Sequence, residues 1–230
     1  MRHWLVLTLV YALVACGEAQ PPFHVTDAMR SSAVAAYDRG ALRSALDAIV
    51  SWHRKHGSQI PALLRPGLTD PEIDALLGEI GCKPPQELRE IWKWHDGHKD
   101  TGEAEWLVWY HQLLPAEDAV REYRSLRAQP FLTWSKNWLP VLFFEQEWYF
   151  VECDATERAA SPLMHYFTES GPTPAYVNLT TFFATAVQSM SDGAVYMTGK
   201  PPRMECDIRR VSEIHQLHNP GLPFPYYVRK

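Results

Sequence analysis

The sequence predicts a single α+β domain in which N-terminal helices pack on a mostly antiparallel central sheet and a C-terminal helix closes the fold. Apolar residues recur at helical spacing through the first part of the chain. Aromatic and β-branched residues become dense from Trp106 onward, and an apolar helical segment returns at Leu179. A chain of 230 residues can bury a substantial core, and we expect the domain to cover residues 25–230.

Capping residues and apolar stripes place the predicted helices. Thr26 is a favourable N-cap for a first helix from Asp27, which we expect Gly40 to interrupt and His56–Ser58 to end. The apolar face of this helix recurs at i, i+4, i+7 and i+8, at Leu42, Leu46, Ile49 and Val50. Further helices are predicted at about residues 70–80, 85–94, 115–126 and 179–190.

The strands are predicted from apolar, aromatic and β-branched runs, at residues 106–110, 138–144, 148–151 and 163–167. The second and third should form a hairpin around Glu145–Glu147, although Gln-Glu is not a favoured two-residue turn. Residues 192–230 carry five of the 18 prolines and are expected to wrap the domain in short pieces.

Charge and composition exclude several classes of protein. The 22 basic and 27 acidic residues give a net charge of −5, and no run of lysine or arginine suggests a face for nucleic acid. With 46% hydrophobic and 21% charged residues, the chain has the composition of a folded domain, not of a disordered protein or a coiled coil.

Residues 1–15 have the pattern of a secretory signal peptide. A positive start precedes the apolar run Trp4–Ala15, which spans about 18 Å as a helix and is too short to cross a bilayer core of about 30 Å. Leu13–Cys16 then resembles the lipobox of bacterial lipoproteins, in which the cysteine becomes the N-terminus and is acylated, for example with palmitate. An ordinary signal peptide, or a first core helix with an incidental cysteine, is the alternative.

The lipobox resemblance implies a location. It implies lipidation of Cys16, a lipidated tether over residues 16–24, and a membrane-anchored lipoprotein of the bacterial cell envelope that faces the periplasm or the exterior. Several acyl chains would make such an anchor durable, because one chain binds a membrane only marginally.

The other three cysteines are Cys82, Cys153 and Cys206, and they contain no C-x-x-C spacing, which disfavours a zinc ribbon. Outside the cytoplasm one disulfide among the three is possible, with one thiol left over. We favour buried free thiols, because unpaired cysteine packs as a small apolar residue.

Two histidine pairs have a spacing that could bind a metal. His95 with His98, and His215 with His218, form H-x-x-H spacings, but neither pair has the adjacent glutamate of a zinc-binding H-E-x-x-H helix. We therefore expect surface or half-buried histidines and no metal site.

Four acids bracket the predicted hairpin: Glu145, Glu147, Glu152 and Asp154. Two of them could form the carboxylate pair of an envelope hydrolase if they faced one cleft at about 5–9.5 Å, whereas acids at strand ends are more often solvated. The sequence also lacks motifs for nucleotide binding and for a serine nucleophile. We expect a protein that is not an enzyme and needs no cofactor.

Tryptophan is the most unusual feature of the composition, with nine residues. Trp92 and Trp94 are two positions apart, so on a helix one enters the core while the other faces a loop or a partner. Exposed tryptophans anchor protein interfaces strongly. We expect a partner-binding surface formed by Trp94, His95, Asp96, Trp106 and Trp109; core packing of these tryptophans is the alternative.

A series of short motifs runs in a familiar order: Leu63–Gly67, Glu72–Ile73, Gly81, Pro85, Glu87–Leu88, Trp94–Gly97, Trp138–Pro140 with Asp154, the helix from Leu179, and His218–Gly221. This order resembles the SUKH superfamily, and more narrowly its Smi/Knr family of cell-wall-synthesis regulators and bacterial immunity proteins. Two positions depart from that family. Leu77 stands where a second glutamate is common, and Pro84 replaces the leucine of a Leu-Pro step.

The resemblance implies a non-catalytic binding module. Our first hypothesis is a membrane-anchored immunity protein that neutralises a toxin by one-to-one occlusion; the alternative is an envelope scaffold or a regulator of cell-wall or polysaccharide synthesis. The expected partners are a protein, either toxin or envelope machinery, and the membrane through Cys16. Nucleic acid is not expected.

Overall fold

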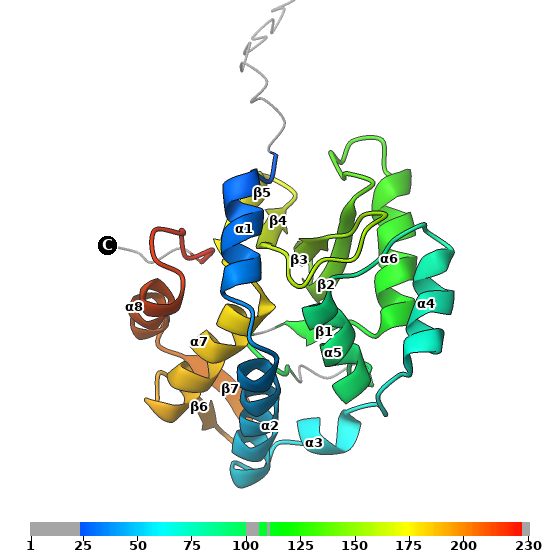
Figure 1. Cartoon of the computed structure of the whole chain (residues 1–230). Helices are drawn as coiled ribbons and strands as arrows, with labels where there is room; N and C mark the ends of the chain where they lie inside the picture. Colours follow the sequence, from blue (N-terminus) through cyan, green and yellow to red (C-terminus); the bar gives the residue numbers. More distant parts are fainter. Residues whose placement is uncertain (1–23, 100–105, 110, 227–230) are drawn as a thin grey trace, which may run out of the picture.

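The computed structural model describes residues 24–99, 106–109 and 111–226 (Figure 1). Cys16 and the predicted signal peptide lie outside these residues. The helices are α1 (Asp27–Ala35), α2 (Arg39–Lys55), α3 (Ile60–Leu63), α4 (Asp70–Gly78), α5 (Gln86–Trp94), α6 (Ala116–Ala128), α7 (Leu179–Ser191) and α8 (Ile208–His218). The strands are β1 (Gln112–Leu113), β2 (Trp138–Phe144), β3 (Glu147–Glu152), β4 (Leu163–Phe167), β5 (Gly171–Tyr176), β6 (Val195–Thr198) and β7 (Arg203–Cys206).

The central sheet is antiparallel and follows the chain. Its order is β1-β2-β3-β4-β5, so every strand pairs with its neighbours in sequence. The predicted hairpin of β2 and β3 is confirmed, and it turns at Glu145, which has a φ of 52°. Strands β6 and β7 form a separate two-stranded sheet. The helices α1 to α5 precede the sheet, the strands follow one another as a meander, and α7 and α8 come after it. This arrangement confirms the predicted α+β fold.

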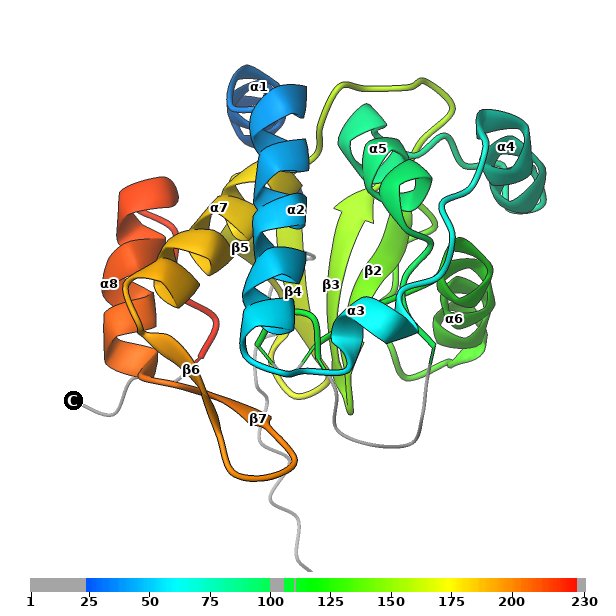
Figure 2. The same cartoon turned by 90° about the horizontal axis from the view of Figure 1, so that it is seen from below.

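Alternating side chains give the sheet two buried faces. Tyr149 and Val151 of β3 join the main core, together with residues of α2, α5 and α7, which lie over this face in Figure 2. Trp148 and Phe150 point the other way, into a second apolar cluster. We call this the aromatic cluster; its buried members are Val25, Leu126, Trp134, Trp138, Trp148, Phe150, Met164 and Tyr166.

The predicted helix starts are confirmed by their caps. Thr26 Oγ1 accepts the backbone N–H of Met29 at 3.2 Å, and α1 begins at Asp27. The Glu72 carboxylate accepts the backbone N–H of Thr69 at 2.7 Å, at the start of α4. Pro85 is the N-cap of α5. Local capping chemistry therefore decides these boundaries.

Two predictions about single elements are wrong. Gly40 does not interrupt a helix; the break lies at residues 36–38, where Asp38 accepts the Ala41 N–H at 2.9 Å and starts α2. Residues 106–109 form a bend and turn instead of a strand, and Trp109 has a φ of 42°. The short pieces expected after residue 192 are a hairpin of β6 and β7 and the helix α8, whose N-cap is Asp207.

Strand β5 was not predicted, because it contains Pro172 and Pro174. Proline lacks an N–H and is tolerated where a strand lies at the edge of a sheet. The strand order places β5 at such an edge, so the prolines do not interrupt a ladder on both sides.

The structure pairs Cys82 with Cys153 in a disulfide, with Cα atoms 5.4 Å apart and a sequence separation of 71. This corrects the expectation of free thiols at both positions; Cys206 is not in a disulfide. Lys83 and Asp154 form a backbone bridge beside it, in which the Lys83 N–H donates to the Asp154 carbonyl at 2.9 Å.

Within the described ranges, no helix is long and apolar enough to cross a membrane.

Candidate partner-binding site

The tryptophans predicted to bind a partner lie mainly inside the molecule. Trp94 is 7% exposed, and its indole N–H donates to Asp47 Oδ1 at 2.8 Å. Trp109 is 3% exposed and packs edge-on to Phe182, with ring centroids 5.1 Å apart. Trp106 is half-buried. The alternative of core packing therefore describes Trp94 and Trp109.

His95 and Asp96 make contacts within the fold. The His95 Nδ1–H donates to the Arg65 carbonyl at 2.6 Å. Asp96 is buried; one carboxylate oxygen accepts the Ala116 N–H at 2.7 Å, and the other is 3.0 Å from the Arg65 guanidinium. Burial raises the pKa of Asp96 above its ordinary value, against the opposing effect of these contacts. Asp96 thus holds the first turn of α6.

Two glycines of the same region allow backbones to approach. Gly97 has a φ of 66°, and a Cβ there would lie 2.6 Å from the Leu113 carbonyl oxygen. A Cβ at Gly67 would overlap the Lys93 carbonyl. Any other residue at either position would push two segments apart.

Burial leaves Trp94, Asp96 and Trp109 with little surface to offer another protein in this conformation. We therefore place the candidate site elsewhere, on the outer faces of α4 and α5. The helix α5 separates the two regions: Leu88, Ile91, Trp92 and Trp94 are buried, whereas Gln86, Arg89, Glu90 and Lys93 line an open groove.

The groove has a volume of about 880 Å³, and we call it the α4–α5 groove. Its lining comes from α4, α5, the segment Gly81–Lys83, the start of α2 and residues 155–157. Four basic and four acidic side chains line it: Arg39, Lys83, Arg89, Lys93, Asp70, Asp74, Glu90 and Glu157. Its formal charge is therefore balanced.

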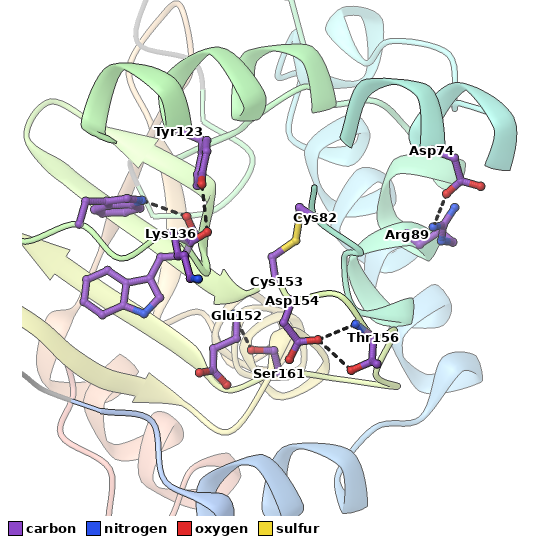
Figure 3. The surroundings of a disulfide bond; sticks show 12 residues. Asp74, Cys82, Arg89, Tyr123, Lys136, Glu152, Cys153, Asp154, Thr156 and Ser161 are labelled. Carbon is purple, nitrogen blue, oxygen red and sulfur yellow. Dashed lines mark hydrogen bonds and ion pairs between the residues drawn. A yellow bond between two sulfur atoms is a disulfide. The ribbon is translucent and has the colours of Figure 1, made fainter. Parts of the chain in front are cut away.

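Arg89 lies at the centre of the charged lining, with a side chain only 12% exposed. Its guanidinium is 2.7 Å from Asp74 and 3.2 Å from Asp70, and Nε is 3.9 Å from Glu157. Figure 3 shows Arg89 turned toward Asp74 on the neighbouring helix. Because Arg89 of α5 contacts α4 and the segment after β3, it links the three walls of the groove.

The ion pairs continue along α5 toward α2. Lys93 is 3.0 Å from Asp70 and 3.5 Å from Glu90, and Glu90 is 2.7 Å from Arg39. The hydrogen bond from Lys93 is the main cause that lowers the pKa of Asp70 below its ordinary value. Exposed ion pairs of this kind add little stability one by one, but together they fix the orientation of side chains that a partner would meet.

The disulfide forms part of the groove wall. Cys82 and Lys83 line the groove, and Cys153 is followed by Asp154, which accepts the backbone N–H and the hydroxyl of Thr156 at 2.8 and 2.9 Å (Figure 3). Arg158 is 2.8 Å from Asp154. The segment after β3 is thus fixed to the segment before α5 by covalent and polar contacts.

The family model described as SMI1/KNR4 (SUKH-1) matches residues 67–185, more than half of the 230-residue chain. The chain belongs to the SMI1/KNR4 family. No curated protein matches it in sequence. The match begins at Gly67 and ends within α7, so it contains most of the groove, the sheet and the disulfide of this SUKH-1 protein.

A buried carboxyl group lies behind the groove of the SUKH-1 domain. Glu87 of α5 is fully buried, and its oxygens accept the backbone N–H groups of Ser161 at 3.0 Å and Leu179 at 3.2 Å. Burial raises the pKa of Glu87 to about 8, although the backbone donors oppose the shift. Since Leu179 is the first residue of α7, Glu87 joins α5 to the start of that helix and to the segment before β4.

The two acids at the ends of β3 do not have the spacing of a hydrolase pair. Glu147 and Glu152 are the two ends of β3, about 16 Å apart at 3.3 Å per residue, beyond the spacing of about 5–9.5 Å that glycoside hydrolysis uses. Glu152 is bound by Arg30 at 2.7 Å, and Glu145 is exposed at the turn. These positions give the hydrolase hypothesis no support. Among the described residues, no cluster of three or more potential metal ligands is found.

The sequence does contain a signal for the groove that the tryptophan argument missed. Asp70 and Asp74 are four residues apart on α4, and Arg89 and Lys93 are four residues apart on α5. Each pair therefore shares one helix face. Opposite charges on two successive helices indicate facing surfaces only once the helices are known to be neighbours, which the tertiary structure supplies.

Proposed function

We propose that this SUKH-1 protein is anchored to a membrane of the bacterial cell envelope, where it neutralises a toxin by binding it one to one and covering its functional surface. The observation that carries this proposal is the α4–α5 groove, a charged and internally ordered recess on the outside of the domain. The family supports a protein-binding role in general.

The chemistry of the groove favours a protein partner. Small-molecule sites are mostly apolar, whereas this groove is lined by charges of both signs. Nucleic acid needs a surface with excess positive charge, and the lining is balanced. A protein surface with its own acidic and basic side chains can exchange contacts with the network around Arg89, and the pre-ordered side chains would lose little entropy on binding.

The disulfide supports a location outside the cytoplasm. Disulfides persist in oxidising compartments and are rare among cytosolic proteins, and Cys82–Cys153 lies in the folded domain, separate from the lipobox that suggests export. A toxin directed at the envelope fits an inhibitor held there.

The groove can be tested with substitutions on its exposed rim. The full-length protein would be purified from membranes, and the protein that co-purifies with it identified and expressed. We expect Lys83→Glu and Gln86→Arg to weaken binding of that protein at least about tenfold, because both side chains are exposed and line the groove. Arg209→Glu, on the exposed face of α8, is the matched control and should bind normally.

Growth assays separate neutralisation from the alternative. Production of the partner should stop growth of a strain that lacks this protein, and the wild-type gene but not Lys83→Glu should restore it. Equal binding by all variants would contradict the assignment of the groove. A deletion strain with weakened resistance to detergent and osmotic stress in pure culture, without any toxin, would favour an envelope scaffold or a regulator of wall synthesis instead.

The anchor is tested at one residue. Cys16→Ser should abolish acylation, because a hydroxyl is a far weaker nucleophile than a thiolate, and the protein should leave the membrane fraction. The measurement is fractionation of both proteins after labelling with a fatty-acid analogue. Label on Cys16→Ser, or no label on the wild type, would contradict the lipoprotein proposal.

A further inference from the structure

We propose that the loop between α6 and β2, residues 129–137, is a membrane-contacting surface that inserts Phe131 into the bilayer that carries the lipid anchor. This inference rests on the proposed anchoring at Cys16. Phe131 is 78% exposed, the most exposed large hydrophobic side chain among the described residues. It lies in the short apolar sequence Pro130-Phe131-Leu132 at one end of the molecule.

Contacts with the aromatic cluster and with α6 hold the loop in place. Leu132 packs against the aromatic cluster, where Trp134 is buried. The Arg127 guanidinium donates to the Trp134 carbonyl at 3.0 Å, and the Tyr123 hydroxyl donates to the Lys136 carbonyl at 3.0 Å (Figure 3). Phe131 therefore projects from a fixed base, with most of its side chain exposed to solvent.

The tether from Cys16 joins the domain near the loop, so the anchor would hold this end of the domain close to the membrane. Val25 belongs to the same aromatic cluster as Leu132 and Trp134, and the start of α1 and the loop after α6 both lie at the upper end of Figure 1. The segment from Cys16 to His24 spans at most about 29 Å even if fully extended. A compact domain of about 200 residues has a radius of gyration of about 17 Å, hence a diameter of roughly 40 Å. The opposite end, with β6 and β7, therefore cannot reach the bilayer while the anchor is inserted.

Charge next to Phe131 favours an anionic bilayer. Arg127, just before the loop, and Lys136, within it, are exposed, and within the parts of the chain that the structure describes neither forms an ion pair with an acid. Basic residues beside an inserted aromatic ring are attracted to anionic lipid headgroups. The occupant that fits the loop is thus a phospholipid surface with anionic lipid.

The test places a tryptophan at the tip of the loop. Acylated full-length Phe131→Trp would be reconstituted into vesicles of about three parts phosphatidylcholine to one part phosphatidylglycerol, with and without bromine on the acyl chains. After subtraction of the wild-type signal, we expect the brominated lipid to quench the added fluorescence by about half, as for a ring buried about 5–10 Å deep. Tyr196→Trp, 45% exposed in β6 at the opposite end, is the matched control and should not be quenched.

The outcomes separate this inference from the anchor itself. The mass of the N-terminal peptide reports acylation of Cys16 independently of fluorescence. Acylated protein in which Phe131→Trp is quenched no more than Tyr196→Trp would overturn the membrane surface and leave the anchor intact. Unacylated protein would overturn both. Adding Lys136→Glu to Phe131→Trp should reduce the quenching, and an unchanged value would contradict the part assigned to charge.

Discussion

Glu87, Asp96 and Gly97 belong to the sequence motifs that resemble the family, and each joins two parts of the fold. Glu87 accepts N–H groups from the segment before β4 and from the first residue of α7. Asp96 accepts the N–H of the first residue of α6. Gly97 allows the chain to pass close to the backbone after β1. These residues are better explained by assembly of the domain than by contact with a partner.

Gly97 offers a direct test at the residue scale. Gly97→Ala should lower the free energy of unfolding by at least about 3 kcal/mol, because φ is positive and the new Cβ would overlap the Leu113 carbonyl oxygen. Gly78→Ala is the control: it lies in α4 with no atom within 4 Å of its Cβ position and should stabilise by up to about 1 kcal/mol. Urea unfolding followed by circular dichroism measures both. Similar values for the two would contradict the steric argument.

At the scale of elements, the α4–α5 groove exists because segments distant in sequence are tied together. The disulfide joins the segment before α5 to the end of β3, and the Lys83–Asp154 bridge lies beside it. Gln86 donates its backbone N–H to the Arg158 carbonyl at 2.8 Å. One wall of the groove therefore depends on contacts between a helix and a strand-end loop.

Removal of the disulfide should loosen this wall. Cys82→Ala with Cys153→Ala should cost about 4 kcal/mol of unfolding free energy, since the bond closes a loop of 71 residues that is free in the unfolded chain without it. Cys206→Ala should cost much less, because that cysteine is outside the disulfide and only half-buried. The comparison is made by denaturant unfolding without reductant. A double variant as stable as the wild type would show that the crosslink contributes nothing.

At the scale of the whole molecule, buried ionisable groups couple stability to pH. Burial lowers the pKa of His53 and of His111 to about 4 and raises that of Glu87 to about 8. His53 Nε2–H donates to the Leu107 carbonyl at 3.0 Å, and Tyr226 lies 3.1 Å from His111 Nδ1. Burial also lowers the pKa of His215 and His218.

These shifts predict maximum stability near pH 6.5. Below that pH the unfolded chain gains protons on His53 and His111 that the folded domain does not, so stability falls as the pH falls toward 4. Above it Glu87 stays protonated only in the folded domain, so stability falls by about 1.4 kcal/mol per pH unit up to about pH 8. Unfolding free energies measured from pH 4.5 to 8.5 check both limbs.

A variant identifies the group behind the alkaline limb. Glu87→Gln removes the titrating carboxyl, so the decline between pH 6.5 and 8 should disappear even if overall stability is lower. Glu79→Gln, an exposed glutamate paired with Arg124, should keep the decline. A decline of the same slope in Glu87→Gln would assign it to another residue.

Much of the local structure followed from the sequence alone. Caps at Thr26, Thr69 and Pro85 placed helix starts, and runs of apolar, aromatic and β-branched residues placed β2, β3 and β4, because these features depend on residues close in sequence. The order of motifs also predicted the family that the match over residues 67–185 shows. The predictions for Gly40 and residues 106–109 failed because the conformation there depends on tertiary neighbours.

The tertiary structure alone decided which surfaces are available. Trp94 has the same local pattern whether it faces a partner or the core, and only the packing of α5 against Asp47 of α2 buries it. The pairing of Cys82 with Cys153 and the contact of Arg89 with Asp74 likewise join residues that sequence spacing does not relate. Helices and strands are stabilised by residues close in sequence. A groove depends on how elements distant in sequence are placed next to one another, which long-range packing determines.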